Sequence, residues 1–212
     1  MMDISVLWKL SYGMYALGTW DKERPTGCII NTAVQVTSEN PTIAISLNKD
    51  NFTYEALCQS KRFSLSVLSE KTNPNVIAKL GFSSGRVCDK FDSTLFSWEV
   101  YDELPVVLEN AAGYVTASVL AVHEMETHAV ILARIEQTKN GADYTPMTYK
   151  YYHEVMKGKA PKNAPTYQKE ENTEKKWICG VCGYAFPGDL SMEADTFICP
   201  VCGQPKSVFK RS

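Results

Sequence analysis

Two short cysteine motifs, Cys179-Gly-Val-Cys182-Gly183-Tyr184 and Cys199-Pro-Val-Cys202-Gly203, decide the fold of the last part of this chain. Each motif places two thiols on one tight turn, and sixteen residues lie between Cys182 and Cys199. Four thiolates brought together by two such turns form a tetrahedral cage of soft ligands, which suits zinc or iron. A segment of fewer than about 40 residues rarely folds without a metal or disulfides. The sequence therefore predicts a structural metal site formed by Cys179, Cys182, Cys199 and Cys202.

The residues around the cysteines favour iron but leave zinc open. Gly183 and Gly203 follow the second cysteine of each motif, where the backbone can turn and direct N–H groups to the sulfurs. Such hydrogen bonds tune the potential of an iron centre. Aromatic side chains can form an apolar floor beneath the metal; the five in this small unit are Trp177, Tyr184, Phe186, Phe197 and Phe209. From spacing and composition alone, a zinc ribbon that binds a partner remains the alternative.

The motifs with their flanks resemble the rubredoxins, in which four cysteines hold one iron that carries one electron at a time. The resemblance rests on Lys176-Trp-Ile-Cys-Gly-Val-Cys-Gly-Tyr184, Phe197-Ile-Cys-Pro-Val-Cys-Gly203 and Pro205-Lys-Ser-Val-Phe209. The spacer between the motifs is shorter than in free-standing rubredoxins and is similar to that of the truncated form at the end of rubrerythrins. This resemblance implies a rubredoxin-like Fe(Cys)4 domain over residues 176–212.

Length and charge narrow the classes of function for the whole chain. Its 212 residues allow one medium domain beside the small one. The 22 basic and 24 acidic residues nearly balance, which argues against a nucleic-acid or membrane-surface partner. No apolar stretch is long enough for a transmembrane helix, and residues 1–5 lack the features of an export signal. Cys28, Cys58 and Cys88 are predicted to be reduced thiols, so we expect a cytoplasmic protein.

The first domain is predicted to be mainly β. Two runs alternate cleanly, Thr42–Leu47 and Arg62–Leu68, and helical periodicity is local. Without regular βα alternation, an antiparallel barrel is favoured over a doubly wound sheet. The other expected β segments are Thr26–Thr37, Ala111–Val122 and Ala129–Gln137; the expected helices are Ile4–Leu10, Phe52–Cys58, Val76–Leu80 and Tyr149–Met156. Polar residues 168–175 are assigned as the linker between a domain over 1–167 and the tail.

One anion site is suggested by the residues themselves. The β run ends at Ser46-Leu-Asn48-Lys49-Asp50-Asn51, and a helix is predicted to start at Phe52. A helix N-terminus beside hydroxyl and amide donors and one lysine can hold a phosphate. The alternative is that Asp50 or Asn51 merely caps the helix while Lys49 is solvated.

Several separated segments resemble the FMN-binding flavin-reductase family, which has a split-barrel fold. They are Gly27–Ser38, Pro41–Thr53, Phe63–Leu68, Lys90-Phe91, Glu126-Thr127-His128 and Lys159–Tyr167. Members are usually homodimers with FMN in a groove near the subunit interface. Many pass electrons from NAD(P)H to flavin, whereas flavoredoxin-like members act mainly as electron carriers. The resemblance therefore implies an antiparallel split β-barrel with a few helices, FMN as cofactor and a homodimer.

The same resemblance assigns individual residues to the flavin. His128 matches the family histidine beside flavin and nicotinamide, with a structural histidine at a hairpin end as the alternative. Gly27 and Cys28 are expected along the isoalloxazine. The ribityl chain and phosphate are assigned to Asn31, Thr32, Ser46, Asn48, Lys49, Asn51 and Thr53. No Gly-x-Gly-x-x-Gly motif is present, so NADH or NADPH is expected as a transient substrate in the flavin groove.

The two parts together resemble the high-molecular-weight rubredoxins, a family of NADH:rubredoxin oxidoreductases. This implies an oxidoreductase that takes electrons from NAD(P)H through FMN to the iron and on to a redox partner, by analogy a diiron flavoprotein that reduces oxygen or nitric oxide. Two alternatives stay open. The protein could be a carrier without nicotinamide activity, or the tail could be a zinc-ribbon interaction module.

Overall fold

The structure, a computed structural model, describes residues 3–158 and 177–211. The predicted domain end at residue 167 and the predicted linker 168–175 lie outside these ranges, so they stay predictions. None of the described helices has the length and apolar character needed to span a bilayer.

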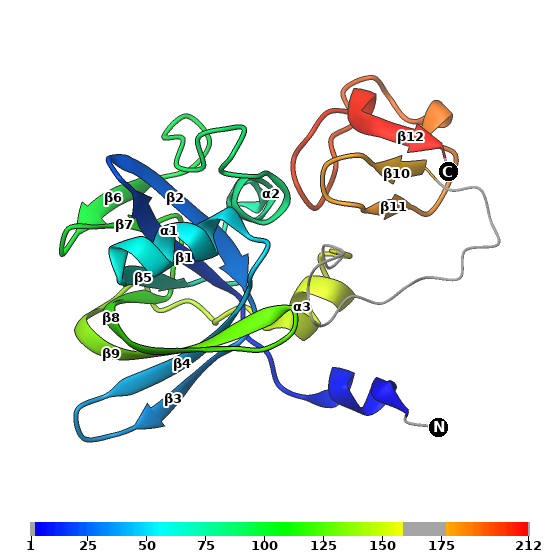
Figure 1. Ribbon diagram of the computed structural model, residues 1–212. Coiled ribbons are helices and arrows are strands. Elements are labelled where there is room, and N and C mark those ends of the chain that lie inside the picture. The colour runs from blue at the N-terminus through cyan, green and yellow to red at the C-terminus, as the bar shows by residue number, and fades with distance from the viewer. Residues whose placement is uncertain (1–2, 159–176, 212) are drawn as a thin grey trace.

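A seven-stranded antiparallel sheet forms the body of the first domain, in the order β2-β1-β5-β8-β9-β4-β3 (Figure 1). Its two edge strands are joined by Asn31 and Thr32 alone, a link whose flanking Cα atoms can be at most about 11 Å apart. The edges must therefore lie close together, and the sheet curls into a barrel. The strands are β1 (Tyr15–Asp21), β2 (Arg24–Ile30), β3 (Ala33–Thr37), β4 (Thr42–Asn48), β5 (Arg62–Val67), β8 (Gly113–Glu124) and β9 (His128–Asn140).

Alternation along β4 and β9 explains which residues fill the barrel. Ile43, Ile45 and Leu47 of β4 are buried, while the residues between them are half-buried on the other face. β9 repeats the pattern from Ala129 onward, so the two strands share an apolar inner face. The expected mainly β, antiparallel fold with few helices is confirmed.

Helices close the barrel and frame its loops. Asn51 caps α1 (Phe52–Ser60) by accepting the Thr53 N–H at 3.0 Å, and Asn73 does the same for α2 (Pro74–Phe82). The expected closing helix is α3 (Tyr149–Glu154), and the expected N-terminal helix is the 3-10 segment η1 (Ile4–Lys9).

Two features of the strand pattern differ from expectation. The β run Thr26–Thr37 is not one strand, because the chain leaves one edge of the sheet after Ile30 and enters the other at Ala33. Three further strands were not predicted: β1, and the hairpin of β6 (Trp98–Tyr101) with β7 (Leu104–Val107).

The tail is a three-stranded sheet in the order β11-β10-β12. Its aromatic residues pack edge to face: the Phe197 ring lies 5.3 Å from Phe186 and 5.8 Å from Phe209. Tyr184 meets Phe209 at 6.4 Å, so four of the five expected aromatics form one floor. Trp177 instead donates from Nε1 to Asp189 at 3.0 Å. The elements are β10 (Trp177–Cys179), β11 (Ala185–Phe186), η2 (Leu190–Met192), η3 (Lys206–Val208) and β12 (Phe209–Arg211).

Candidate functional sites: a four-cysteine centre and a flavin groove

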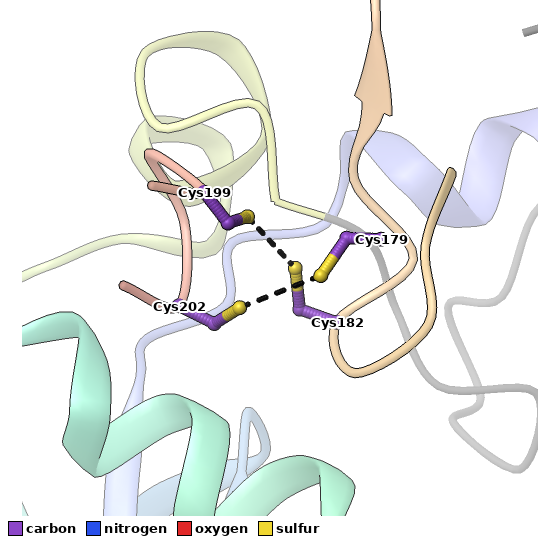
Figure 2. A group of neighbouring side chains, drawn as sticks. All are labelled: Cys179, Cys182, Cys199 and Cys202. Carbon is purple, nitrogen blue, oxygen red and sulfur yellow. Dashed lines mark hydrogen bonds between the residues drawn. The ribbon is translucent and has the colours of Figure 1, made fainter. Parts of the chain in front are cut away.

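The four predicted cysteines converge on one point (Figure 2). Their sulfurs all lie within 4.8 Å of one another, with Cys179–Cys202 at 3.6 Å and Cys182–Cys199 at 3.5 Å. A tetrahedral ion with metal–sulfur bonds of about 2.3 Å separates its ligands by about 3.8 Å. A disulfide would need sulfurs about 2.05 Å apart. The spacing therefore fits one tetrahedral metal and excludes a disulfide.

Backbone N–H groups surround the sulfurs in a repeated pattern. In the first turn the N–H of Cys182 donates to the Cys179 sulfur, and that of Tyr184 donates to the Cys182 sulfur. Cys202 and Gln204 supply the equivalent N–H groups in the second turn. The two glycines were expected to direct N–H groups to the sulfurs, but their own N–H groups do not point there. With φ of 75° and 68°, Gly183 and Gly203 allow the turns, but their own N–H groups donate to the Cys179 and Cys199 carbonyls.

The four buried thiols cannot all lose their protons unless a cation balances their charge. A hydrogen bond with Cys182 lowers the pKa of Cys179, and the same contact raises the pKa of Cys182. All four side chains are at most 1% exposed, so water cannot relieve the repulsion between thiolates. A bound metal ion allows all four to be thiolates together.

In the barrel, several of the predicted flavin residues share the outer face of β4 and β9. Asn48 lies directly opposite His128 in the strand register. The Ser46 N–H donates to the Thr32 carbonyl at 3.3 Å, where the two sheet edges meet. Thr32 in turn donates from Oγ1 to the Asn31 side chain at 3.0 Å. These residues are half-buried, so they line a surface that a ligand can reach.

The other predicted residues lie beneath that surface. Cys28 is 3% exposed and Thr53 is 1% exposed. Burial raises the pKa of Cys28 to about 11, as expected for a thiol that is not a nucleophile, with hydrogen bonds from Thr53 and Asn51 partly opposing the rise. Gly27 packs so closely that a Cβ would be 2.3 Å from the Leu17 carbonyl oxygen. Gly27, Cys28 and Thr53 therefore lie beneath the half-buried surface and are not part of it.

Lys49 is not merely solvated. Its Nζ pairs with Glu124 Oε2 at 3.2 Å, and Tyr54 donates from its hydroxyl to Glu124 Oε1 at 3.0 Å. The Lys49 N–H donates to the Thr127 carbonyl at 3.0 Å, which ties the lysine to the β8–β9 turn. Neither Glu124 nor Tyr54 is predicted from the sequence, because each meets Lys49 or its partner only in the folded barrel. Asn51 caps α1, as in the structural alternative, whereas Lys49 pairs with a carboxylate and is not simply solvated. The phosphate site stays a prediction.

His128 begins β9 at the end of this cluster. Its Nδ1 lies 2.8 Å from Thr127 Oγ1, and partial burial lowers the pKa of His128 below its ordinary value. The imidazole is therefore neutral at pH 7.

Lys90, which the sequence singled out only as part of a family-like segment, is 3% exposed. Its Nζ donates to the Leu80 carbonyl at 2.8 Å and to the Ser83 carbonyl at the end of α2. Burial lowers the pKa of Lys90 to about 8, and the nearby Cys28 partly opposes this shift. A single lysine in the sequence carries no signal of such burial.

Comparison with known proteins settles the family. Residues 7–158 match the model of the flavin reductase like domain. The chain belongs to the flavin reductase-like family. Its tail, residues 177–210, matches the model described as rubrerythrin, rubredoxin-like domain. Within the family, a high molecular weight rubredoxin from Moorella thermoacetica is 31% identical over 99% of this chain and all of the relative.

Two further relatives cover the barrel. A ferric-chelate reductase (NAD(P)H) from Archaeoglobus fulgidus is 32% identical over 78% of this chain and 98% of the relative. The crystal structure of an FMN-binding protein from Thermus thermophilus has the same fold, with a TM-score of 0.57 at 20% identity over 64% of this chain and 74% of that one. This member of the flavin reductase-like family is thus an oxidoreductase with a flavin-reductase barrel and a four-cysteine site for one iron.

Proposed function

We propose that this protein transfers electrons from NADH or NADPH, through FMN in the barrel, to the iron held by the tail and on to a separate acceptor protein. The observation that carries the proposal is the presence of two candidate sites in one chain: a cluster of four cysteines, and a half-buried polar surface on β4 and β9 whose lysine, Lys49, pairs with Glu124. The relative from Moorella matches both parts over its whole length, and the relative from Archaeoglobus is described as using NAD(P)H.

The half-buried residues on and beside β4 and β9 have distinct proposed roles. Lys49 and Asn48 bind the FMN phosphate at the end of β4, where the chain turns into α1. Thr32 and Ser46 hold the ribityl chain at the seam of the barrel, together with Asn31 and Asn51. His128 lies opposite Asn48 and orients the flavin or the nicotinamide as a neutral imidazole. Gly27 and Cys28 shape the floor beneath the isoalloxazine, and Thr53 supports the residues that hold the ribityl chain and phosphate.

FMN held by these residues would supply the link between a two-electron hydride donor and a one-electron iron centre. Each NADH oxidised to NAD⁺ yields two electrons and one proton, so the tail must discharge twice per NADH. Cys179, Cys182, Cys199 and Cys202 keep water from the metal, and the N–H groups directed at their sulfurs favour the reduced centre.

The acceptor and the assembly are part of the proposal. By family analogy the acceptor is a diiron flavoprotein that reduces oxygen or nitric oxide. We also propose a homodimer. Its support is the edge strand β3, which exposes Val34 at 59% and Val36 at 53% beside the Asn31–Thr32 seam. Light scattering of the purified protein at several concentrations tests the dimer.

Anaerobic mixing of the FMN- and iron-loaded protein with NADH tests the electron route. The flavin absorbance should bleach first, and the iron absorbance should follow in the same molecules. Protein stripped of FMN but loaded with iron should leave the iron oxidised. Iron reduction without FMN would contradict the route. Failure of NADH and NADPH to reduce either centre would favour a carrier loaded by another protein.

A further inference from the structure

Glu124 forms an ion pair with Lys49, the lysine that the proposed phosphate site needs. The Glu124 carboxylate uses both oxygens: Oε2 pairs with Lys49 Nζ at 3.2 Å, and Oε1 accepts from the Tyr54 hydroxyl at 3.0 Å. Hydrogen bonds from Lys49 and, to a smaller extent, from Tyr54 lower the pKa of Glu124 and so favour its ionised form. The Tyr54 ring is only 9% exposed, so its hydroxyl is a fixed point that directs the carboxylate to the lysine.

The backbone keeps this arrangement in place. Glu124 is the last residue of β8 and pairs with Ala129 in the hairpin register. Lys49 is fixed to the turn of the same hairpin through its N–H bond to the Thr127 carbonyl. The backbones that carry the acid and the lysine are thus held together by the same hairpin. Rotation of the exposed Glu124 side chain is the smallest movement that separates the pair.

We infer that Glu124 competes with the flavin phosphate for Lys49 and so sets how strongly the protein prefers FMN to riboflavin. The inference rests on the proposed function, because it requires the phosphate to bind at Lys49. A phosphate at Lys49 Nζ would also lie beside the carboxylate, and like charges at that distance repel. Glu124 must turn toward solvent, which its 61% side-chain exposure permits. The protein therefore binds FMN less tightly than the same phosphate site would without the charge of Glu124.

The test compares FMN and riboflavin affinities of the iron-loaded protein by quenching of flavin fluorescence. Glu124→Gln keeps the size and the bond from Tyr54 but removes the charge. It should tighten FMN binding by about two- to fivefold, the scale of an exposed ion pair, and leave riboflavin unchanged. Added salt should shrink the difference. Glu126→Gln removes an equal charge from the exposed turn nearby and is the matched control.

Two further results decide the mechanism. In a Lys49→Met background the gain from Glu124→Gln should fall, because no cation remains to compete for. Three results would overturn the inference, provided that wild type still prefers FMN to riboflavin. They are an undiminished gain in the Lys49→Met background, an equal gain from Glu126→Gln, and an unchanged FMN affinity in Glu124→Gln. If wild type binds neither flavin, the proposed function itself fails, and the inference falls with it.

Discussion

Gly203 lies directly against Asn75: a Cβ built on Gly203 would be 3.2 Å from the Asn75 side-chain oxygen. Gly203 belongs to the second cysteine turn, and Asn75 belongs to the first turn of α2, which faces the tail in Figure 1. Val201, between the two cysteines of that turn, is fully buried. One apolar cluster continues from α2 to the four cysteines. The metal end of the tail therefore packs on the barrel through α2.

Replacing Gly203 by Ala should disturb both the turn and this contact. At φ of 68° an added Cβ costs about 1–2 kcal/mol of tail stability. It also pushes Asn75 away, so iron reduction by NADH should slow while flavin reduction keeps its rate. Stopped-flow absorbance separates the two steps. Asn75→Ala in the same chain removes the clash but not the backbone strain, so partial recovery of iron reduction would assign the loss to the contact.

Iron reduction in the intact chain should not depend on protein concentration. Both centres belong to one chain, so their effective concentration is on the mM scale whatever the dilution. The measurement is the first-order rate of iron reduction after anaerobic mixing with excess NADH over a wide dilution range. A rate that rises in proportion to protein concentration would mean that electrons pass between molecules.

Removal of one metal ligand should unfold the tail and spare the barrel. In Cys182→Ser a thiolate is lost from a fully enclosed site, and metal binding supplies most of the folding free energy of so small a unit. We expect loss of the red colour and of near-ultraviolet circular dichroism from Trp177, with FMN affinity unchanged. Cys58→Ser changes a thiol outside the centre and is the control. Stoichiometric zinc in a colourless wild-type tail, after expression with ample iron, would remove the electron-transfer function.

Lys49→Ala should weaken FMN binding by about 1–3 kcal/mol, or about 5- to 150-fold, the scale of a hydrogen bond to a charged group. Riboflavin should bind weakly to wild type and be almost indifferent to the change, because it lacks the phosphate. Titration calorimetry with both flavins measures this. Equal losses for FMN and riboflavin would place the phosphate elsewhere.

His128→Asn should slow flavin reduction moderately and leave iron binding intact, because hydride transfer needs no proton from histidine. Burial lowers the folded-state pKa of His128. Its contribution to stability is therefore fully present above the ordinary pKa of about 6.5 and is lost as pH falls through the lower folded value. Thermal melts between pH 5 and pH 7 should show a shallower decline for the variant. Complete loss of reduction with FMN still bound would make His128 essential.

The parts predictable from sequence are those that depend on neighbours in the chain. Cysteine ligands sit on tight turns, so their spacing alone predicts the metal site, and alternation in Thr42–Leu47 predicts β4. Strand β1 was missed because Gly18 and Thr19 interrupt its apolar residues. In the structure Thr19 is fully buried and donates to the Arg62 carbonyl at 2.7 Å, a partner 43 positions away.

The role of Glu124 and the burial of Lys90 could not be predicted for the same reason: both depend on residues that are distant in the sequence. Glu124 reaches Lys49 only after the hairpin register brings the ends of β8 and β4 together, 75 positions apart in sequence. Lys90 is held by carbonyls at the end of α2, which no local pattern reveals. The Asn31–Thr32 break was hidden because β-favouring residues continue through it, and only closure of the barrel separates the two strands.

The enclosure of the four sulfurs has a consequence for how the molecule is made. During synthesis the strands of the barrel emerge from the ribosome before Cys199 and Cys202, so the barrel can form while the tail still lacks half of its ligands. Iron insertion can then take place only after the barrel strands have been synthesised. Under iron shortage, cells would accumulate a flavin protein whose electrons have no protein-bound outlet, and such a flavin would pass them to dissolved oxygen.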